Sequence, residues 1–240
     1  KFFKSFQFNT TIRNTLLINL YSLVVGFPLP IFLALMINQM RAKRFKKIFQ
    51  TITYMPHFIS TVVMVGIILL FLSPSSGVIG NIYSLFNVNA PNLMANAAAF
   101  PSIYVWSDVW QHIGWDSIIY IAALSSVDPT LYEAATVDGA NRWQKLLHID
   151  LPMLIPTAAI LLILRIGNLM SIGFEKVYLM QNDMNLSTSE VIATYVYKIG
   201  IISAQYSYSA AINMFNTIVN FILLITVNLV LKRVCKQSLW

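Results

Sequence analysis

Long apolar stretches alternate with short polar segments along the 240-residue chain. A helix needs about 20 mostly apolar residues to cross the hydrocarbon of a bilayer. Each stretch of that length is expected to be helical, because an open strand would leave backbone groups unpaired in lipid. No internal repeat is detectable, so the pattern predicts an all-α polytopic membrane protein with a single domain, residues 1–240. The predicted spans are Thr11–Ile37, Tyr54–Leu72, Ser102–Leu124, Met153–Ile172 and Ala210–Leu231.

Two local patterns modify this picture. The segment Gly26–Pro30, GFPLP, lies inside the first span, and its prolines remove helical hydrogen bonds, so a kink or break is predicted there. In the mixed segment 173–209, Ser187 followed by Glu190 reads as a capping box, which predicts a short helix at the membrane surface.

Cations gather in segments that would share one side of the membrane. They are Arg41–Lys47 (RAKRFKK), Arg142, Lys145, Lys232, Arg233 and Lys236, whereas Ser73–Pro101 contains none. The positive-inside rule makes the basic segments cytoplasmic. This orientation leaves the N-terminus outside although no signal peptide is visible. A further upstream span, six in all, would bring the true N-terminus inside.

Composition agrees with a membrane protein. Hydrophobic residues make up 57% of the chain, charged residues only 10%, and the mean hydropathy is +0.67, whereas a soluble domain carries about 25% charge. The net charge of +7 follows from topology, so no nucleic-acid partner is expected. A single cysteine, Cys235, excludes an internal disulfide and a cysteine-based metal cluster.

The polar segment Glu133–Pro152 lies between the third and fourth predicted spans, on the cytoplasmic side. Asp128 is an N-cap followed by proline, which predicts a helix over Pro129–Val137. Gly139 permits a sharp turn, and Asn141–His148 can form a second helix before the next span begins at Leu151-Pro152. Residues 128–152 are therefore expected to present a short helix-turn-helix to a soluble partner.

The same segment resembles a known motif. Glu133-Ala134-Ala135, Gly139, Ile149 and Leu151-Pro152 match the EAA motif of type I, binding-protein-dependent ABC importer permeases at its fixed positions. Asp138-Gly139-Ala140 resembles the form found in carbohydrate-uptake permeases related to the maltose system. The segments YMPHFIS, IGWDSIIYIAAL, GFEKVYLM and SEVIATYVY are similar to the subgroup that imports complex oligosaccharides and lipo-oligosaccharides, whose members have six spans.

The resemblance implies a function, a set of partners and a location. The chain would be the permease subunit of an ATP-driven importer in a bacterial cell membrane, translocating an oligosaccharide delivered by an extracellular substrate-binding lipoprotein. A second homologous permease and a cytoplasmic ATPase dimer would complete the complex. The ATPase-coupling residues would be Glu133, Ala134, Ala135, Asp138, Gly139 and Ala140, with Glu133 as a charged contact, the alanines permitting close approach and Gly139 setting the angle between the helices.

No catalytic site is expected on this chain. The sequence has no G-x-x-x-x-G-K-[ST], so ATP and Mg²⁺ would bind the separate ATPase. His57, His112 and His148 lack metal-ligand spacing and do not accompany a recognisable nucleophile, so no metal is expected either.

Polar residues within the spans are costly and usually face a cavity or a neighbouring helix. Asn213, Asn216 and Asn220 share one helical face, and their carboxamides suit either sugar hydroxyls or helix–helix hydrogen bonds. Trp110 and Asp116 are equally open between a substrate pathway and packing. Trp106 fits an interfacial aromatic belt.

Arg165 lies well inside the fourth span and needs a counter-charge, which either Asp116 or Asp108 could supply. An ion pair that holds helices together is the favoured interpretation. The alternative to an ABC permease is a self-contained secondary transporter, in which Asp116 and Arg165 would couple transport to ions. Such transporters typically contain internal repeats.

Overall fold

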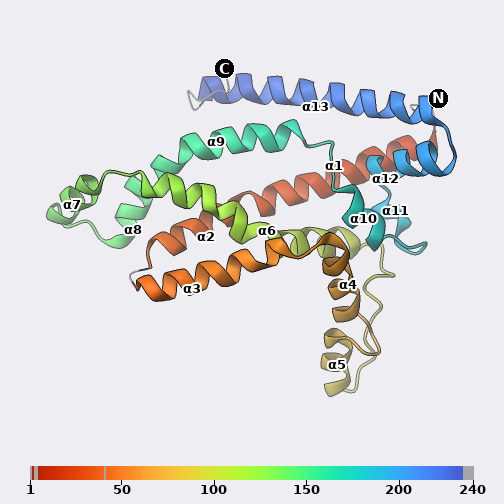
Figure 1. Cartoon of the computed structure of the whole chain (residues 1–240), viewed down its shortest axis with the longest axis horizontal. Coiled ribbons are helices and arrows are strands. Elements are labelled where there is room, and N and C mark those ends of the chain that lie inside the picture. The colour runs from red at the N-terminus through yellow and green to blue at the C-terminus, as the bar shows by residue number, and fades with distance from the viewer. Residues whose placement is uncertain (1, 3–4, 41, 235–240) are drawn as a thin grey trace. The chain divides into compact units, whose positions relative to one another are not determined.

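The structure is a computed structural model that describes residue 2, residues 5–40 and residues 42–234. Arg41, Cys235 and Lys236, which the sequence analysis singles out, lie outside the described residues. The described chain is helical, and no strand occurs in it (Figure 1). It folds into two compact units, each built from three segments.

Unit 1 comprises residues 1–22, 59–108 and 169–221. It contains the first part of α1 (Phe6–Gly26), α4 (Thr61–Phe71), α5 (Val78–Leu85), the first part of α6 (Phe100–Ser125), α10 (Phe174–Met180), α11 (Leu186–Ser189), α12 (Ile192–Tyr197), the π turn Lys198–Ile202 and the first part of α13 (Tyr206–Val234).

Unit 2 comprises residues 23–58, 109–168 and 222–240. Besides the remaining parts of α1, α6 and α13, it contains α2 (Pro28–Asn38), α3 (Lys43–Tyr54), the 3-10 turn Met55–Phe58, α7 (Pro129–Val137), α8 (Arg142–Lys145), the π turn Leu146–Asp150 and α9 (Leu151–Gly167).

Helical stretches in the described chain match several of the predicted spans. Three are long and apolar enough to cross a membrane: Gln7–Asn38, Arg142–Gly167 and Tyr206–Arg233. The predicted interruption near Gly26–Pro30 is present, because α1 ends at Gly26 and α2 begins at Pro28. The third predicted span is a continuous helix, α6, but its polar residues make it less apolar than these three stretches. The count of five spans stays a prediction.

The second predicted span, Tyr54–Leu72, is wrong as a single helix. Lys43–Phe58 and Thr61–Phe71 are separate helical stretches bent by 100°. Ser60 is extended (ψ 150°), and its hydroxyl accepts a hydrogen bond from the Val63 amide, so it begins a new helix. The cations of RAKRFKK also belong largely to α3 rather than to a loop, because the helix starts at Lys43.

The end of the fourth span and one cap also differ from expectation. Residues 168–172 are not helical, and the helical stretch instead reaches back to Arg142. Ser187 lies within α11 rather than capping a helix. The short helix that was expected there is α12, where the Thr194 hydroxyl accepts from the Val191 amide. The capping-box assignment is therefore wrong, although the short helix exists.

Unit 1 is held together by polar groups inserted between helices. The buried Asn185 carboxamide donates to the carbonyls of Met94 and Met180, and Asn14 of α1 donates to the carbonyls of Ser187 and Glu190. Buried backbone carbonyls rarely stay unpaired. These side chains therefore connect the segment 181–191 to α1, to α10 and to the residues that precede α6.

Unit 2 combines an apolar core with one very close helix approach. Ala34, Leu35, Tyr120, Leu124 and Leu154 form the buried cluster, from α2, α6 and α9. On another face of α6, a Cβ placed on Gly114 would lie 2.0 Å from the Thr53 carbonyl oxygen, so only glycine permits this contact with α3. Beside it, the rings of His57 and Trp115 stack at 4.3 Å.

Candidate functional site

The segment 128–152 forms the expected hairpin, which Figure 1 shows as α7 and α8. Asp128 caps α7, because its carboxylate accepts from the Thr130 amide at 2.9 Å, and this bond lowers the pKa of Asp128. Asn141 and Gln144 form a reciprocal capping box that starts α8. The second helix differs from the prediction: instead of ending at His148, it continues through the π turn into α9.

Gly139 makes the turn between the two helices. Its φ is +78°, in the left-handed region that side chains with a Cβ disfavour. A Cβ placed there would meet nothing within 4 Å, so the requirement for glycine comes from the backbone and not from crowding. The Ala140 amide then donates to the Ala135 carbonyl at 2.8 Å, and Lys145 Nζ donates to the Thr136 hydroxyl at 2.6 Å. These bonds fix the hairpin angle.

Asp150 anchors the hairpin to the rest of unit 2. Its side chain is fully buried, accepts a hydrogen bond from the Tyr132 hydroxyl of α7 and accepts another from Gln39 Nε2 at 2.9 Å. Burial, and then the bond to Asp150, raise the pKa of Tyr132 to about 12. Asp150 was not among the predicted site residues. A carboxylate at the predicted start of an apolar helix is the signal that could have identified it.

The outward side of the hairpin is exposed. Glu133, Ala134, Asp138 and Gly139 are exposed, whereas Ala135 and Ala140 are half-buried. Val137 is 89% exposed and Trp143 70%. Apolar side chains held this far into solvent on a rigid hairpin are typical of a protein interface.

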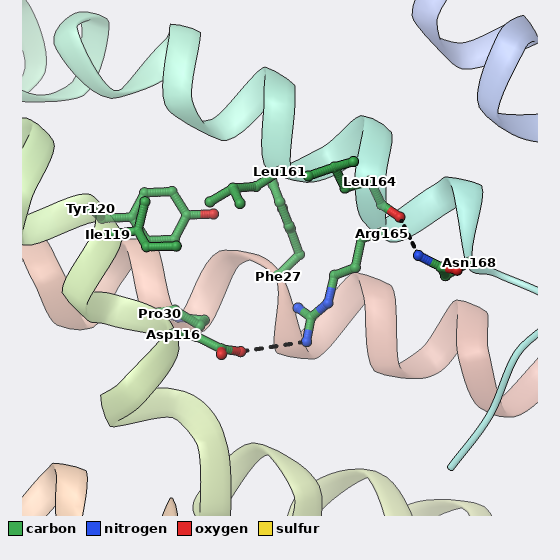
Figure 2. Close-up of a pocket in the computed structure, with 9 residues that line it drawn as sticks. All are labelled: Phe27, Pro30, Asp116, Ile119, Tyr120, Leu161, Leu164, Arg165 and Asn168. Atoms are coloured by element: carbon green, nitrogen blue, oxygen red, sulfur yellow. Dashed lines mark hydrogen bonds and ion pairs between the residues drawn. The ribbon is translucent and has the colours of Figure 1, made fainter. Parts of the chain in front are cut away.

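A second feature of unit 2 is a pocket of about 340 Å³, shown in Figure 2. Its polar members are Asp116, Tyr120, Arg165 and Asn168. Its apolar wall consists of Phe27, Pro30, Ile119, Leu161 and Leu164.

Asp108 and Asp116, both in α6, belong to two different ion pairs. Within the pocket, Arg165 Nη2 lies 3.6 Å from Asp116 Oδ2 (Figure 2). Asp108 instead pairs with Lys176 of α10 at 3.3 Å, in unit 1. Of the two counter-charges considered for Arg165, Asp116 is thus the one in contact. Lys176 was not among the predicted site residues. Its side chain is only 6% exposed, and its ammonium lies 5.0 Å from the centre of the Tyr104 ring. Burial lowers the pKa of Lys176, and Asp108 opposes that shift.

The other pathway candidates are not in this pocket. Asn220 is engaged within unit 1: its carboxamide oxygen accepts from the Met170 amide at 2.9 Å, and its nitrogen donates to the Ser171 hydroxyl at 3.0 Å. The Asn216 oxygen is buried without a hydrogen-bond partner in the described chain, while Asn213 is exposed. Trp110 is 52% exposed.

Comparison with known proteins identifies the family. Residues 26–236 match the family model described as the binding-protein-dependent transport system inner membrane component. The chain belongs to this family. This permease is 38% identical to Protein LplB of Bacillus subtilis (strain 168), over 100% of the chain and 75% of LplB. It is also 38% identical to the polygalacturonan/rhamnogalacturonan transport system permease protein YteP of the same organism, over 95% of the chain and 71% of YteP.

A solved structure agrees. The permease superimposes on a chain of a bacterial alginate ABC transporter in complex with an alginate pentasaccharide-bound periplasmic protein, with a TM-score of 0.95 and 41% identity, covering 99% of this chain and 82% of that one. The protein is therefore a multi-pass membrane permease of the type I ABC importer fold. These similarities support the ABC permease and not the self-contained secondary transporter.

Proposed function

We propose that this permease translocates an oligosaccharide and that residues 128–152 couple it to a cytoplasmic ATPase, beside a second, homologous permease subunit. Relatives support the substrate class, since they are named for polygalacturonan/rhamnogalacturonan, arabinooligosaccharide and alginate transport. ATP and Mg²⁺ would bind the ATPase, and an extracellular receptor would deliver the sugar.

The observation that carries the coupling role is the exposed but anchored hairpin. The buried Asp150 ties α7 to the start of α9 through its hydrogen bond with Tyr132, so a force on the exposed side of α7 would reach α9 instead of bending a loop. Glu133 and Val137 lie on α7, one offering a charged contact and the other an apolar one. This is the mechanical arrangement that a coupling element needs: an accessible face with a rigid connection to a membrane helix.

Purification from native membranes tests the proposal. A tagged chain should bring down an ATPase and a second permease, and substrate should stimulate ATP hydrolysis by the purified complex. In a Cys235→Ser background, Val137→Cys should then cross-link to cysteines placed in the ATPase, while Ser75→Cys, exposed in the connection after α4, should not. Recovery of a homo-oligomer without an ATPase would contradict the proposal.

A further inference from the structure

Arg165 carries a charge that its surroundings satisfy only in part. Its ion pair to Asp116 is 3.6 Å long, whereas a charge-assisted hydrogen bond measures roughly 2.7–2.9 Å. No hydrogen bond to the guanidinium occurs within the described residues, although that group has several N–H donors. Both side chains of the pair are 36% exposed. A pair that only fastened two helices would be expected to be closer and more buried.

The pocket around this guanidinium has the make-up of a small-molecule site. Its volume of about 340 Å³ and its mainly apolar lining with a few convergent polar groups fit the usual pattern. Figure 2 shows the guanidinium reaching from α9 toward Asp116 of α6, with Tyr120 on one side of the pocket and Asn168 on the other. Phe27 and the leucines could pack on the C–H face of a sugar ring, while the hydroxyl of Tyr120 and the carboxamide of Asn168 could reach its oxygens.

We propose that Arg165 binds the carboxylate of an acidic sugar residue during passage, and that Asp116 competes with the substrate for the guanidinium. The proposal rests on the proposed function and specifies its substrate class as uronate-containing oligosaccharides. The planar guanidinium matches a carboxylate in two-point geometry, which a neutral sugar cannot offer. Without substrate, Asp116 supplies the counter-charge that an intramembrane arginine requires. Its return displaces the sugar carboxylate, which keeps binding weak enough for release.

If Asp116 competes with the substrate, Asp116→Asn has the opposite effect to the one expected of a purely structural ion pair. With competition, Asp116→Asn frees the guanidinium and lowers the concentration of an acidic sugar at which uptake is half-maximal, while Arg165→Gln raises that concentration. If the pair only holds α6 to α9, both substitutions weaken uptake of every sugar alike. The two variants therefore move in opposite directions under the proposal and together under the alternative.

The test uses the complete complex in proteoliposomes, with trigalacturonate and its fully methyl-esterified form as probes that differ in charge. Arg165→Gln should lower trigalacturonate uptake about tenfold or more, the size of one lost hydrogen bond to a charged group. Uptake of the ester should change by less than about twofold, since no charged bond is lost. Asp116→Asn should lower the trigalacturonate concentration at which uptake is half-maximal, because the guanidinium no longer has a competing partner. The same receptor is used throughout, so the ratio of uptake by the variant to uptake by the wild type cancels the receptor's own preference between the two sugars.

Thiol labelling inside the pocket is a second test. It applies even if the receptor rejects the ester or a variant assembles poorly. In a Cys235→Ser background, a thiol reagent should label Asn168→Cys, and trigalacturonate should slow labelling while the ester should not. Arg165→Lys, which keeps the charge but not the fork, should lose most of that protection. Equal protection by both sugars, or protection that survives Arg165→Gln, would overturn the proposal. Absence of all uptake and of substrate-stimulated ATP hydrolysis in the wild type would instead overturn the proposed function.

Discussion

The hydroxyl of Tyr132 in α7 donates a hydrogen bond to Oδ1 of the buried Asp150, next to the start of α9. Gln39, the residue that follows α2, donates to the other oxygen of the same carboxylate. Donors from two separate parts of unit 2 thus share one acceptor group. Since the hairpin is otherwise exposed, this carboxylate holds it at a fixed angle to α9.

Replacing Asp150 should loosen the hairpin more than replacing Tyr132. Asp150→Ala leaves two donors without their acceptor and should lower the free energy of unfolding by about 2–4 kcal/mol, whereas Tyr132→Phe removes one bond and should cost about 1–2 kcal/mol. Thermal unfolding of the purified complex in detergent measures both. Comparable small losses in the two variants would contradict the anchoring role.

The same contact predicts a pH dependence. Because the pKa of Tyr132 is raised from 10.0 to about 12 in the folded state, its contribution to stability is complete below pH 10 and is lost as the pH rises toward 12. Tyr132→Phe should therefore show a smaller decrease in melting temperature over that interval than the wild type. An identical decrease in melting temperature in the two proteins would contradict this contribution of Tyr132.

The buried pair Lys176–Asp108 in unit 1 gives a second stability prediction. Asp108→Asn leaves a nearly buried ammonium without its counter-charge and should cost about 3–5 kcal/mol. The double variant Asp108→Leu/Lys176→Met removes both charges and should recover much of that loss, because neither then needs solvation. Melting temperatures of the single and double variants decide the matter. A double variant no better than the single one would show that the charges themselves are required.

Substitutions of two asparagines in α13 should distinguish a role in helix packing from a role in transport. Asn220→Leu removes a partner from the Met170 amide and from Ser171, so it should lower stability by about 1–3 kcal/mol and reduce the amount of assembled complex. Asn213 is exposed, so Asn213→Leu should leave assembly unchanged and lower uptake if it lines the pathway. Assembly is measured by size-exclusion chromatography and uptake in proteoliposomes. Normal uptake by Asn213→Leu would remove that residue from the pathway.

Local signals in the sequence predicted those parts of the structure that depend on neighbouring residues. Asp128-Pro129 starts α7, and Gly139 has the left-handed backbone expected of its turn. The sequence-based predictions failed where the structure depends on contacts between residues far apart in the sequence. Nothing local indicates that Tyr132 and Gln39 meet at Asp150, or that Lys176 pairs with Asp108, 68 positions away.

The second span shows a different cause of error. Its hydropathy is continuous across Met55–Ser60, but the extended Ser60 starts a new helix at 100° to the previous one. Average hydropathy does not register a single capping side chain. The spacing of Phe45, Phe49 and Ile52 on one helical face was a usable sign that α3 begins earlier than the apolar run.

Orientation in the membrane can be tested by cysteine labelling in a Cys235→Ser background. Ser76 and Asn92 are exposed in the segment without cations, and Ala42 is exposed beside the cationic start of α3. By the positive-inside rule, a membrane-impermeant thiol reagent should label Ser76→Cys and Asn92→Cys in intact cells. Ala42→Cys should react only after permeabilisation. Labelling of position 42 from outside would reverse the orientation and put the hairpin on the wrong side for an ATPase.

Gly139 provides the sharpest test of coupling, because its φ of +78° and the empty space around it separate backbone strain from crowding. Gly139→Val should strain the turn by about 1–3 kcal/mol and change the angle of α7, since a β-branched residue strongly disfavours that conformation. Gly139→Asn is the matched control, because asparagine adopts the left-handed region more readily than other residues with a Cβ. We expect the valine variant to assemble with its partners while uptake fails and substrate no longer stimulates ATP hydrolysis, and the asparagine variant to retain most of both activities. Reconstituted complexes in proteoliposomes measure uptake and hydrolysis together. Undiminished transport by Gly139→Val, or equal failure of the two variants, would exclude the left-handed turn as the feature on which coupling depends.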